Sequence, residues 1–221
     1  MDRVARIVRH VQASAEETAP ALIAEPTAAT LSGPEPSDDD VVVCCSVRTA
    51  VTRASKGPLK DTPCEDMLVP LFKAIIERTK IDPKKIEDAQ IGNVLQPTAG
   101  GATSRMSMFL AGLPYDIPLA AVNRQCASSL QAVANIATAI RTGTIDVGMA
   151  GGVESMSMYP MTSQTVPEKT SPLVWKNDLA AACQIPMGVT SENVAEKYGL
   201  SREVQDRMGV ESNAKAVAAQ K

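Results

Sequence analysis

Cys126 is the residue whose type and position most directly suggest chemistry. It lies in the run Asn-Arg-Gln-Cys-Ala-Ser-Ser, after an apolar segment expected to form a strand over 119–123 and before an expected helix that Gly143 ends. The free amides and the dipole at a helix N-terminus stabilise a thiolate and can bind an oxyanion. A buried structural cysteine at a helix start is the competing interpretation, and position alone does not decide between the two.

The other cysteines suggest no chemistry. Cys44 and Cys45 fall in an apolar run and are expected in the core, whereas Cys64 and Cys183 occupy expected turn or loop positions. A total of 5 cysteines without a C-x-x-C pair predicts neither a disulfide framework nor a metal site. The only histidine, His10, lies near the N-terminus, so a nucleophilic cysteine in the main part of the chain has no imidazole from this sequence close to it.

Composition restricts the class of protein. Of the 221 residues, 44% are hydrophobic and 21% are charged, which excludes wholesale disorder. The net charge of -3 argues against nucleic acid or an anionic membrane surface as the main partner. No apolar run approaches the roughly 20 residues that span a bilayer, so we expect a soluble protein without a membrane span.

Apolar patterning after residue 40 predicts an α/β fold. Strands are expected over 41–47, 89–95, 119–123 and 147–151, with the first buried at the centre of the sheet. Helices are expected from Met67 until Asp82-Pro83 stops the pattern, over 105–111 and over 130–140. This alternation implies a mainly parallel sheet covered by helices on both faces.

The pattern changes after Met156. A polar, Pro-punctuated stretch, part of a loop region over 157–190, precedes helices expected from Ser191 and from Ser201, the latter with Ser201 as N-cap. The sequence stops at Lys221 inside this last helix, which we interpret as a domain that is incomplete at its C-terminus.

Residues 1–40 are interpreted as a targeting peptide and a linker. Val4, Ile7, Val8 and Val11 form one apolar stripe, and the tract that follows is rich in Pro and Ala and ends in acidic residues. Arg3-Val4 and His10-Val11 resemble an N-terminal peroxisomal targeting signal, which implies the peroxisome as location and its import receptor as partner. A mitochondrial presequence and a frayed helix without a role are the alternatives.

Several motifs in order resemble the thiolase family, and within it the peroxisomal 3-ketoacyl-CoA thiolases of fatty-acid β-oxidation. They are Asn-Arg-Gln-Cys at 123–126, Gly-Gly-Val-Glu-Ser-Met-Ser at 151–157 and Ile-Pro-Met-Gly-Val-Thr-Ser-Glu-Asn at 185–193. The resemblance covers nearly everything after Asp40 and corresponds to the family's N-terminal half.

The resemblance implies an acyltransferase in which Cys126 attacks the keto carbon of a 3-ketoacyl-CoA. Acetyl-CoA leaves, and coenzyme A, a substrate rather than a cofactor, cleaves the acyl-cysteine. By similarity Met156 lies near the acyl pocket, and the loop region with Met187 receives coenzyme A. Asn93 and the segment around Arg124 are implied to lie toward the contact of a homodimer.

Two departures from the family pattern bear on activity. Ser129 stands where family members have glycine, and the activating histidine, the oxyanion element and the second catalytic cysteine belong to the family's other half. A non-catalytic thiolase-like dimerisation or binding module and a biosynthetic acetyl-CoA acetyltransferase are therefore the alternative functions. Gly151-Gly152 is equally consistent with tight strand packing and with a substrate role.

Overall fold

The computed structural model describes residues 37–161 and 170–220, which fall into two units that divide between Thr170 and Ser171. Each unit is described by itself. The predicted targeting stretch lies almost wholly outside the described residues.

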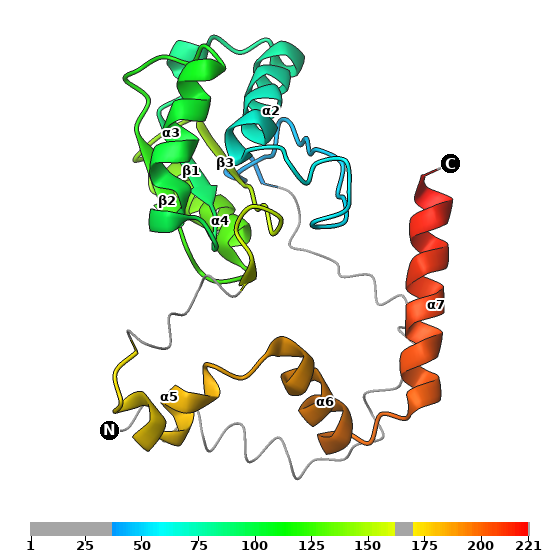
Figure 1. The fold of residues 1–221 in the computed structure, drawn as a ribbon. Coiled ribbons are helices and arrows are strands. Elements are labelled where there is room, and N and C mark those ends of the chain that lie inside the picture. The colour runs from blue at the N-terminus through cyan, green and yellow to red at the C-terminus, as the bar shows by residue number, and fades with distance from the viewer. Residues whose placement is uncertain (1–36, 162–169, 221) are drawn as a thin grey trace. The chain divides into compact units, whose positions relative to one another are not determined.

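A parallel three-stranded sheet forms the centre of the first unit (Figure 1). Its strands are β1 (Asp88–Gly92), β2 (Leu119–Val122) and β3 (Gly148–Gly152), in the order β2-β1-β3. Gly92 pairs with Val122 on one side and with Gly152 on the other, so the carboxyl ends of all three strands lie at one edge. The predicted parallel α/β fold is confirmed.

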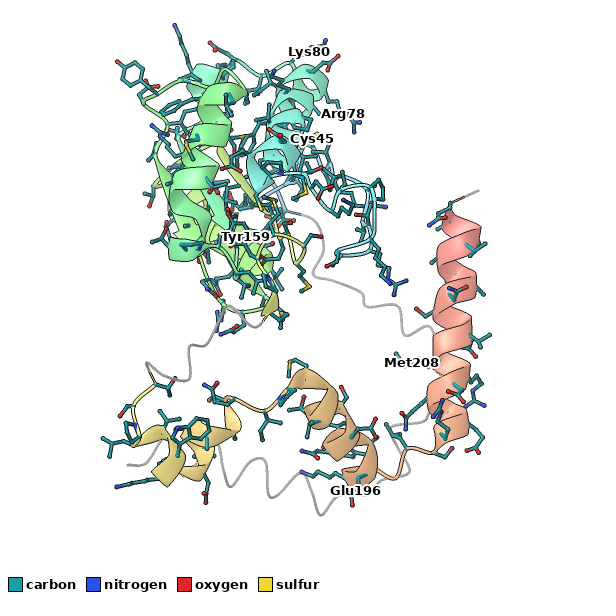
Figure 2. The ribbon with its side chains drawn as sticks, in the orientation of Figure 1. Cys45, Arg78, Lys80, Tyr159, Glu196 and Met208 are labelled. Carbon is teal, nitrogen blue, oxygen red and sulfur yellow. The ribbon has the colours of Figure 1, made fainter. Side chains whose placement is uncertain are left out.

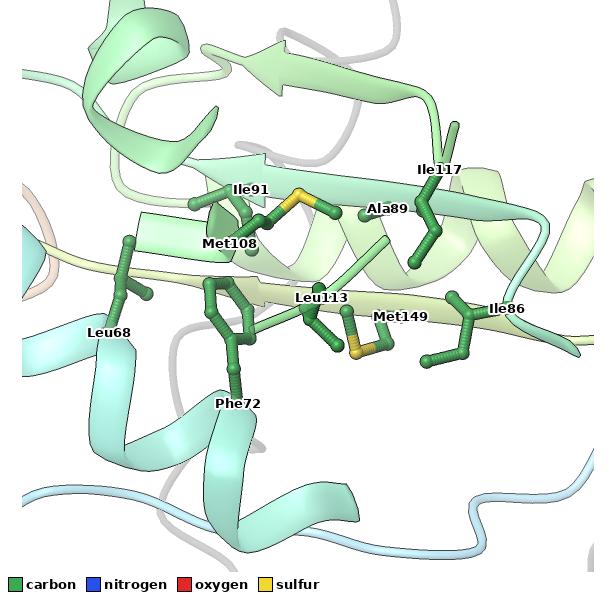
Figure 3. Close-up of a cluster of buried hydrophobic side chains, with 9 residues drawn as sticks. All are labelled: Leu68, Phe72, Ile86, Ala89, Ile91, Met108, Leu113, Ile117 and Met149. Carbon is green, nitrogen blue, oxygen red and sulfur yellow. The ribbon is translucent and has the colours of Figure 1, made fainter. Parts of the chain in front are cut away.

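Helices cover both faces of this sheet. α4 (Ser128–Arg141) packs on β1 and β3, whereas α2 (Cys64–Thr79) and α3 (Gly101–Leu110) pack against each other on the opposite face. Strand β1 alternates accordingly: Ile91 faces α2 and α3, and Gln90 accepts a hydrogen bond from Asn135 of α4 at 2.8 Å. Figure 3 shows the core on the α2 and α3 side, formed by Leu68, Phe72, Ile86, Ala89, Ile91, Met108, Leu113, Ile117 and Met149.

The predicted central strand over 41–47 is wrong. These residues form no strand, and Val42 and Val43 are 71% and 76% exposed. Cys44 is exposed and Cys45 half-buried, so neither is a core residue as predicted. β-branched residues favour strands only where a neighbouring strand supplies hydrogen bonds, and this segment pairs with no described strand. Only Val47 of this run lines the small apolar pocket beside α2 and β3.

The second unit has the helices predicted after residue 190 and is also partly helical within 171–190, where a loop was predicted. It holds η6 (Val174–Lys176), α5 (Asp178–Ala182), α6 (Met187–Lys197) and α7 (Arg202–Ala219), so α6 begins before the expected Ser191. Ser201 caps α7 as predicted, its Oγ accepting the Val204 amide at 3.4 Å. None of the described side chains in this unit is buried, and Met208 on α7 and Glu196 on α6 are exposed (Figure 2). Within the described residues, no helix is long and apolar enough to cross a bilayer.

Candidate active site

Cys126 is exposed in a short loop that joins β2 to α4. Gln125 before it has a left-handed backbone (φ 50°), and the Asn123 Oδ1 accepts the Gln125 amide at 3.1 Å. Ser128 closes the loop from the other side, because its Oγ accepts the Arg124 amide at 2.9 Å and donates to the Gln125 carbonyl. Local hydrogen bonds therefore fix the backbone on either side of the cysteine.

The start of α4 lies directly after this loop. Its N-cap residue, Ala127, has no side-chain acceptor for the first amides of the helix. The amides of Ala127 and Ser128 donate to the carbonyls of Arg124 and Gln125, so the positive end of the helix dipole is the feature near Cys126 that favours a thiolate and a developing oxyanion. Within the described residues Cys126 is exposed, whereas the competing interpretation was a buried structural cysteine.

Two glycines paired across the sheet bring α4 close to the strands. A Cβ at Gly92 would lie 2.5 Å from the backbone of Ser128 and Ser129, and a Cβ at Gly152 would lie 1.9 Å from the Ser129 Oγ. A Cβ at Gly151 would meet only the Ile91 Cδ1, at 4.0 Å. Tight packing therefore accounts for Gly152, whereas space does not require a glycine at 151.

The side chain of Ser129 occupies the space above Gly152. Its Oγ and Cβ are two of the three atoms nearest to the position of a Gly152 Cβ. The departure from the family's glycine is thus located where the start of α4 contacts the end of β3.

Glu154 connects the segments that follow β1 and β3. Its carboxylate accepts hydrogen bonds from the backbone amides of Val94, at 2.9 Å, and Leu95, at 3.2 Å, and from the Asn93 Nδ2 at 3.1 Å. Asn93 is 1% exposed, and its Oδ1 accepts the Gln96 amide at 2.8 Å. Sequence reasoning quoted Glu154 in a motif but gave it no role. An acidic residue two positions after a glycine-ended strand was the available signal.

Cys64 is buried beside Glu154 and begins α2. The predicted turn or loop position of this cysteine is therefore wrong. Burial raises the pKa of its thiol to about 12, and the negative charges of Glu154 and Glu65 contribute further, against a hydrogen bond from the Ser155 backbone that lowers it. A thiol with this pKa is protonated at neutral pH. Cys64 is therefore a poor nucleophile despite its helix-start position.

The predicted substrate-contacting methionines lie in different units. Met156 is 49% exposed and follows β3, so it lies past the same sheet edge as Cys126. Met187 is exposed at the first position of α6. Of the two residues implied to approach a dimer contact, Asn93 is buried within its unit and Arg124 is exposed.

The described residues contain no histidine. Among them, no cluster of histidine, cysteine, aspartate or glutamate is arranged to hold a metal ion. The group that would take the proton of Cys126 is not found in either described range.

Known proteins resemble the chain along its length. Residues 41–221 match the family model for the N-terminal domain of thiolase. The peroxisomal 3-ketoacyl-CoA thiolase A of Rattus norvegicus is 44% identical over 220 residues, covering 100% of this chain and 49% of that protein. The human peroxisomal 3-ketoacyl-CoA thiolase is 46% identical over 191 residues, 86% of this chain and 44% of the relative.

Solved structures of thiolase-fold enzymes also resemble this chain. The dimeric peroxisomal thiolase of Saccharomyces cerevisiae superposes with a TM-score of 0.77 at 38% identity, over 84% of this chain and 48% of that one. An acetyl-CoA acetyltransferase of Bacillus anthracis gives 0.59 at 28% identity, over 74% and 43%. The chain spans about half the length of the relatives it matches. With the family model matched over 41–221, this chain belongs to the thiolase family.

Proposed function

We propose that this chain supplies the nucleophile of a 3-ketoacyl-CoA thiolase, an acyltransferase of fatty-acid β-oxidation. One observation carries the proposal: Cys126 is exposed at the start of α4, in a hydrogen-bonded loop, within a chain that is 44% identical to a peroxisomal 3-ketoacyl-CoA thiolase. The other exposed cysteines, Cys44 and Cys183, lie in a segment without secondary structure and at the C-terminal cap of a short helix.

The proposed chemistry is covalent catalysis in two steps. The Cys126 thiolate adds to the keto carbon of a 3-ketoacyl-CoA, and the bond between C2 and C3 breaks. Acetyl-CoA leaves as an enolate and takes up a proton, and the acyl group remains on sulfur. The thiol of free coenzyme A then attacks this thioester, giving a shortened acyl-CoA and returning the thiolate.

The chain's own residues would assist in distinct ways. The first amides of α4 are suited to stabilise the oxyanion formed in each addition. Met156, past the end of β3, would contact the acyl chain, and Met187 on α6 would contact coenzyme A. Coenzyme A is a substrate here, and the proposal requires no cofactor.

Proton transfer is proposed to depend on groups outside the described residues. The chain's single histidine is His10, which lies outside the described residues. A positioned acid or base increases the reaction rate by about 10²–10⁴-fold. The family's second half is implied to supply these groups. A homodimer is proposed as the working assembly, in line with the dimeric yeast structure.

The peroxisome is the proposed location, since the relatives from rat and human are named peroxisomal. The pairs Arg3-Val4 and His10-Val11 would be read by the import receptor. A mitochondrial location is the alternative.

Affinity labelling tests the assignment of Cys126 without requiring turnover. Bromoacetyl-CoA carries an electrophile on the proposed ligand, and bromoacetamide is the matched reagent without coenzyme A. We expect bromoacetyl-CoA to label Cys126 faster than any other thiol, with competition by free coenzyme A and loss in Cys126→Ala. Cys183→Ala is the control, because Cys183 is also exposed. Labelling that favours Cys44 or Cys183 would refute the assignment.

A non-catalytic thiolase-like module is the second candidate, favoured by the absence of histidine from the described residues. It predicts equal labelling of Cys126 by the two reagents. The biosynthetic acetyl-CoA acetyltransferase is less supported, because the matching structure of that activity has the lower TM-score.

A further inference from the structure

Glu154 is the acceptor for three hydrogen-bond donors at the carboxyl edge of the sheet. The amides of Val94 and Leu95 and the side chain of Asn93 all direct N–H groups at its two oxygens. Only an acceptor-only side chain satisfies this set, because an amide would place its own NH₂ against one of these donors. The carboxylate of Glu154 is half-buried, so these bonds are shielded from competing water.

The turn that Glu154 holds also contacts the loop of Cys126. The Val94 carbonyl accepts a hydrogen bond from the Asn123 Nδ2 at 3.4 Å, and the Oδ1 of the same asparagine accepts the Gln125 amide at 3.1 Å. Gln125 is the residue with the left-handed backbone directly before Cys126. A continuous series of hydrogen bonds thus runs from Glu154 through the β1 turn to the cysteine loop.

We propose that Glu154 is a positioning residue for Cys126, acting through the Val94 turn and Asn123 and not by contact with substrate. The proposal rests on the proposed function in taking Cys126 as the nucleophile. In this proposal the Glu154 carboxylate fixes the Val94 carbonyl. This carbonyl orients the side-chain amide of Asn123, whose Oδ1 accepts the Gln125 backbone amide. Without the carboxylate, the hydrogen bond between the Val94 turn and Asn123 is held less firmly, and the thiol is placed less accurately at the start of α4.

Glu154→Gln in the full chain is the primary test, and Glu87→Gln is its matched control. Glu87 likewise accepts two backbone amides, those of Asp146 and Val147, but it lies at the opposite, amino edge of the sheet. The readouts are hydrogen exchange of the loop amides and the rate of Cys126 alkylation by iodoacetamide, mapped by peptide mass spectrometry. We expect at least about tenfold faster exchange at Val94 and Leu95 and about threefold slower alkylation in Glu154→Gln, with both unchanged in Glu87→Gln.

Asn123→Ala keeps the test decisive if Glu154→Gln does not fold, because Asn123 is exposed and outside the core. It should slow Cys126 alkylation to a similar extent, and adding Glu154→Gln to it should change the rate no further. Unaltered alkylation in Asn123→Ala, additive effects in the double variant, or an equal effect of Glu87→Gln would each overturn the proposal. Alkylation by a small reagent needs neither coenzyme A nor turnover. A failure of the proposed function would appear in bromoacetyl-CoA labelling and not in this comparison.

Discussion

Replacing Gly152 with alanine tests whether α4, and Cys126 with it, is seated on the glycines at the ends of β1 and β3. The added Cβ would lie 1.9 Å from the Ser129 Oγ and 2.9 Å from both the Ser129 Cβ and the Gly92 carbonyl oxygen. Rotation of the Ser129 side chain can relieve the first contact. The other two stay about half an ångström short of the 3.4 Å at which ordinary contacts begin, so the start of α4 or the end of β3 must shift.

The structure also supplies the matched control, since Gly151 is the preceding residue of the same strand. An alanine there meets only the Ile91 Cδ1 at 4.0 Å, and neither glycine has a positive φ. Overpacking costs about 1–3 kcal/mol, whereas removing a glycine from a strand without a clash gains roughly 0.5–1 kcal/mol. We therefore expect Gly152→Ala to be less stable than Gly151→Ala by about 2 kcal/mol or more in urea denaturation.

Ser129→Gly, which introduces the glycine that the resemblance to thiolases implies at this position, should recover part of this loss. It removes two of the three close contacts, so the double variant should be more stable than additivity predicts, with a coupling of about 1 kcal/mol. The midpoint and slope of each urea transition, together with the Cys126 alkylation rate, are measured on all four proteins. If Gly152→Ala matches Gly151→Ala, or if Ser129→Gly restores nothing, the seating of α4 on Gly152 is wrong.

Four further outcomes are expected. Burial raises the pKa of Cys64 from 9.0 to about 12, so this thiol should be alkylated at least about 100-fold more slowly in the folded chain than in urea at pH 8. Peptide mapping measures both rates, and rapid labelling of the folded chain would contradict the burial of Cys64. Because the pKa of Cys64 is higher in the folded state than in the unfolded state, its contribution to stability is complete below about pH 9 and is lost as the pH rises toward about 12. The free energy of unfolding should therefore fall over that range, and Cys64→Ala should remove this part of the fall. The 221-residue chain alone should give thiolysis of a 3-ketoacyl-CoA at least about 100-fold below that of a complete thiolase, and substantial turnover that Cys126→Ala abolishes would show that no further proton-transfer group is needed. Residues 1–40 fused to a fluorescent protein should direct it to peroxisomes, with diffuse cytosolic signal as the contrary result.

Much of the fold was predictable because it depends on local periodicity. The strands at 88–92, 119–122 and 148–152 and the helix at 128–141 were expected to within a few residues, since each has enough apolar side chains on one face to mark its period. The run over 41–47 has an equally strong pattern, yet it forms no strand, because strand formation depends on a pairing partner that no local pattern supplies. The helices within the expected loop were missed for a different reason, because short capped turns such as the one begun by Asn177 lack an apolar stripe.

Of the candidate site, only the position of Cys126 between a strand and a helix was predictable from the sequence. The position of Cys126 follows from one strand, one helix and the junction between them. The acceptor role of Glu154 depends on amides some 60 residues earlier, and these come close only when β1 and β3 pair in register. The low reactivity inferred for Cys64 likewise follows from burial against residues distant in sequence and could not be read from its neighbours.

The contacts that hold the cysteine loop all come from one unit. Asn123, Ser128, Gly92, Gly152 and Glu154 lie within residues 34–170, whereas Met187 belongs to the other unit. Under the proposed function, placing the thiol and binding coenzyme A therefore depend on different parts of the chain. A nucleophile needs a rigid setting accurate to fractions of an ångström, and in our proposal the paired glycines and the half-buried Glu154 carboxylate supply it at the sheet edge. The described helices of the second unit bury no side chain, so they lack a comparable core that would fix the position of a residue such as Met187.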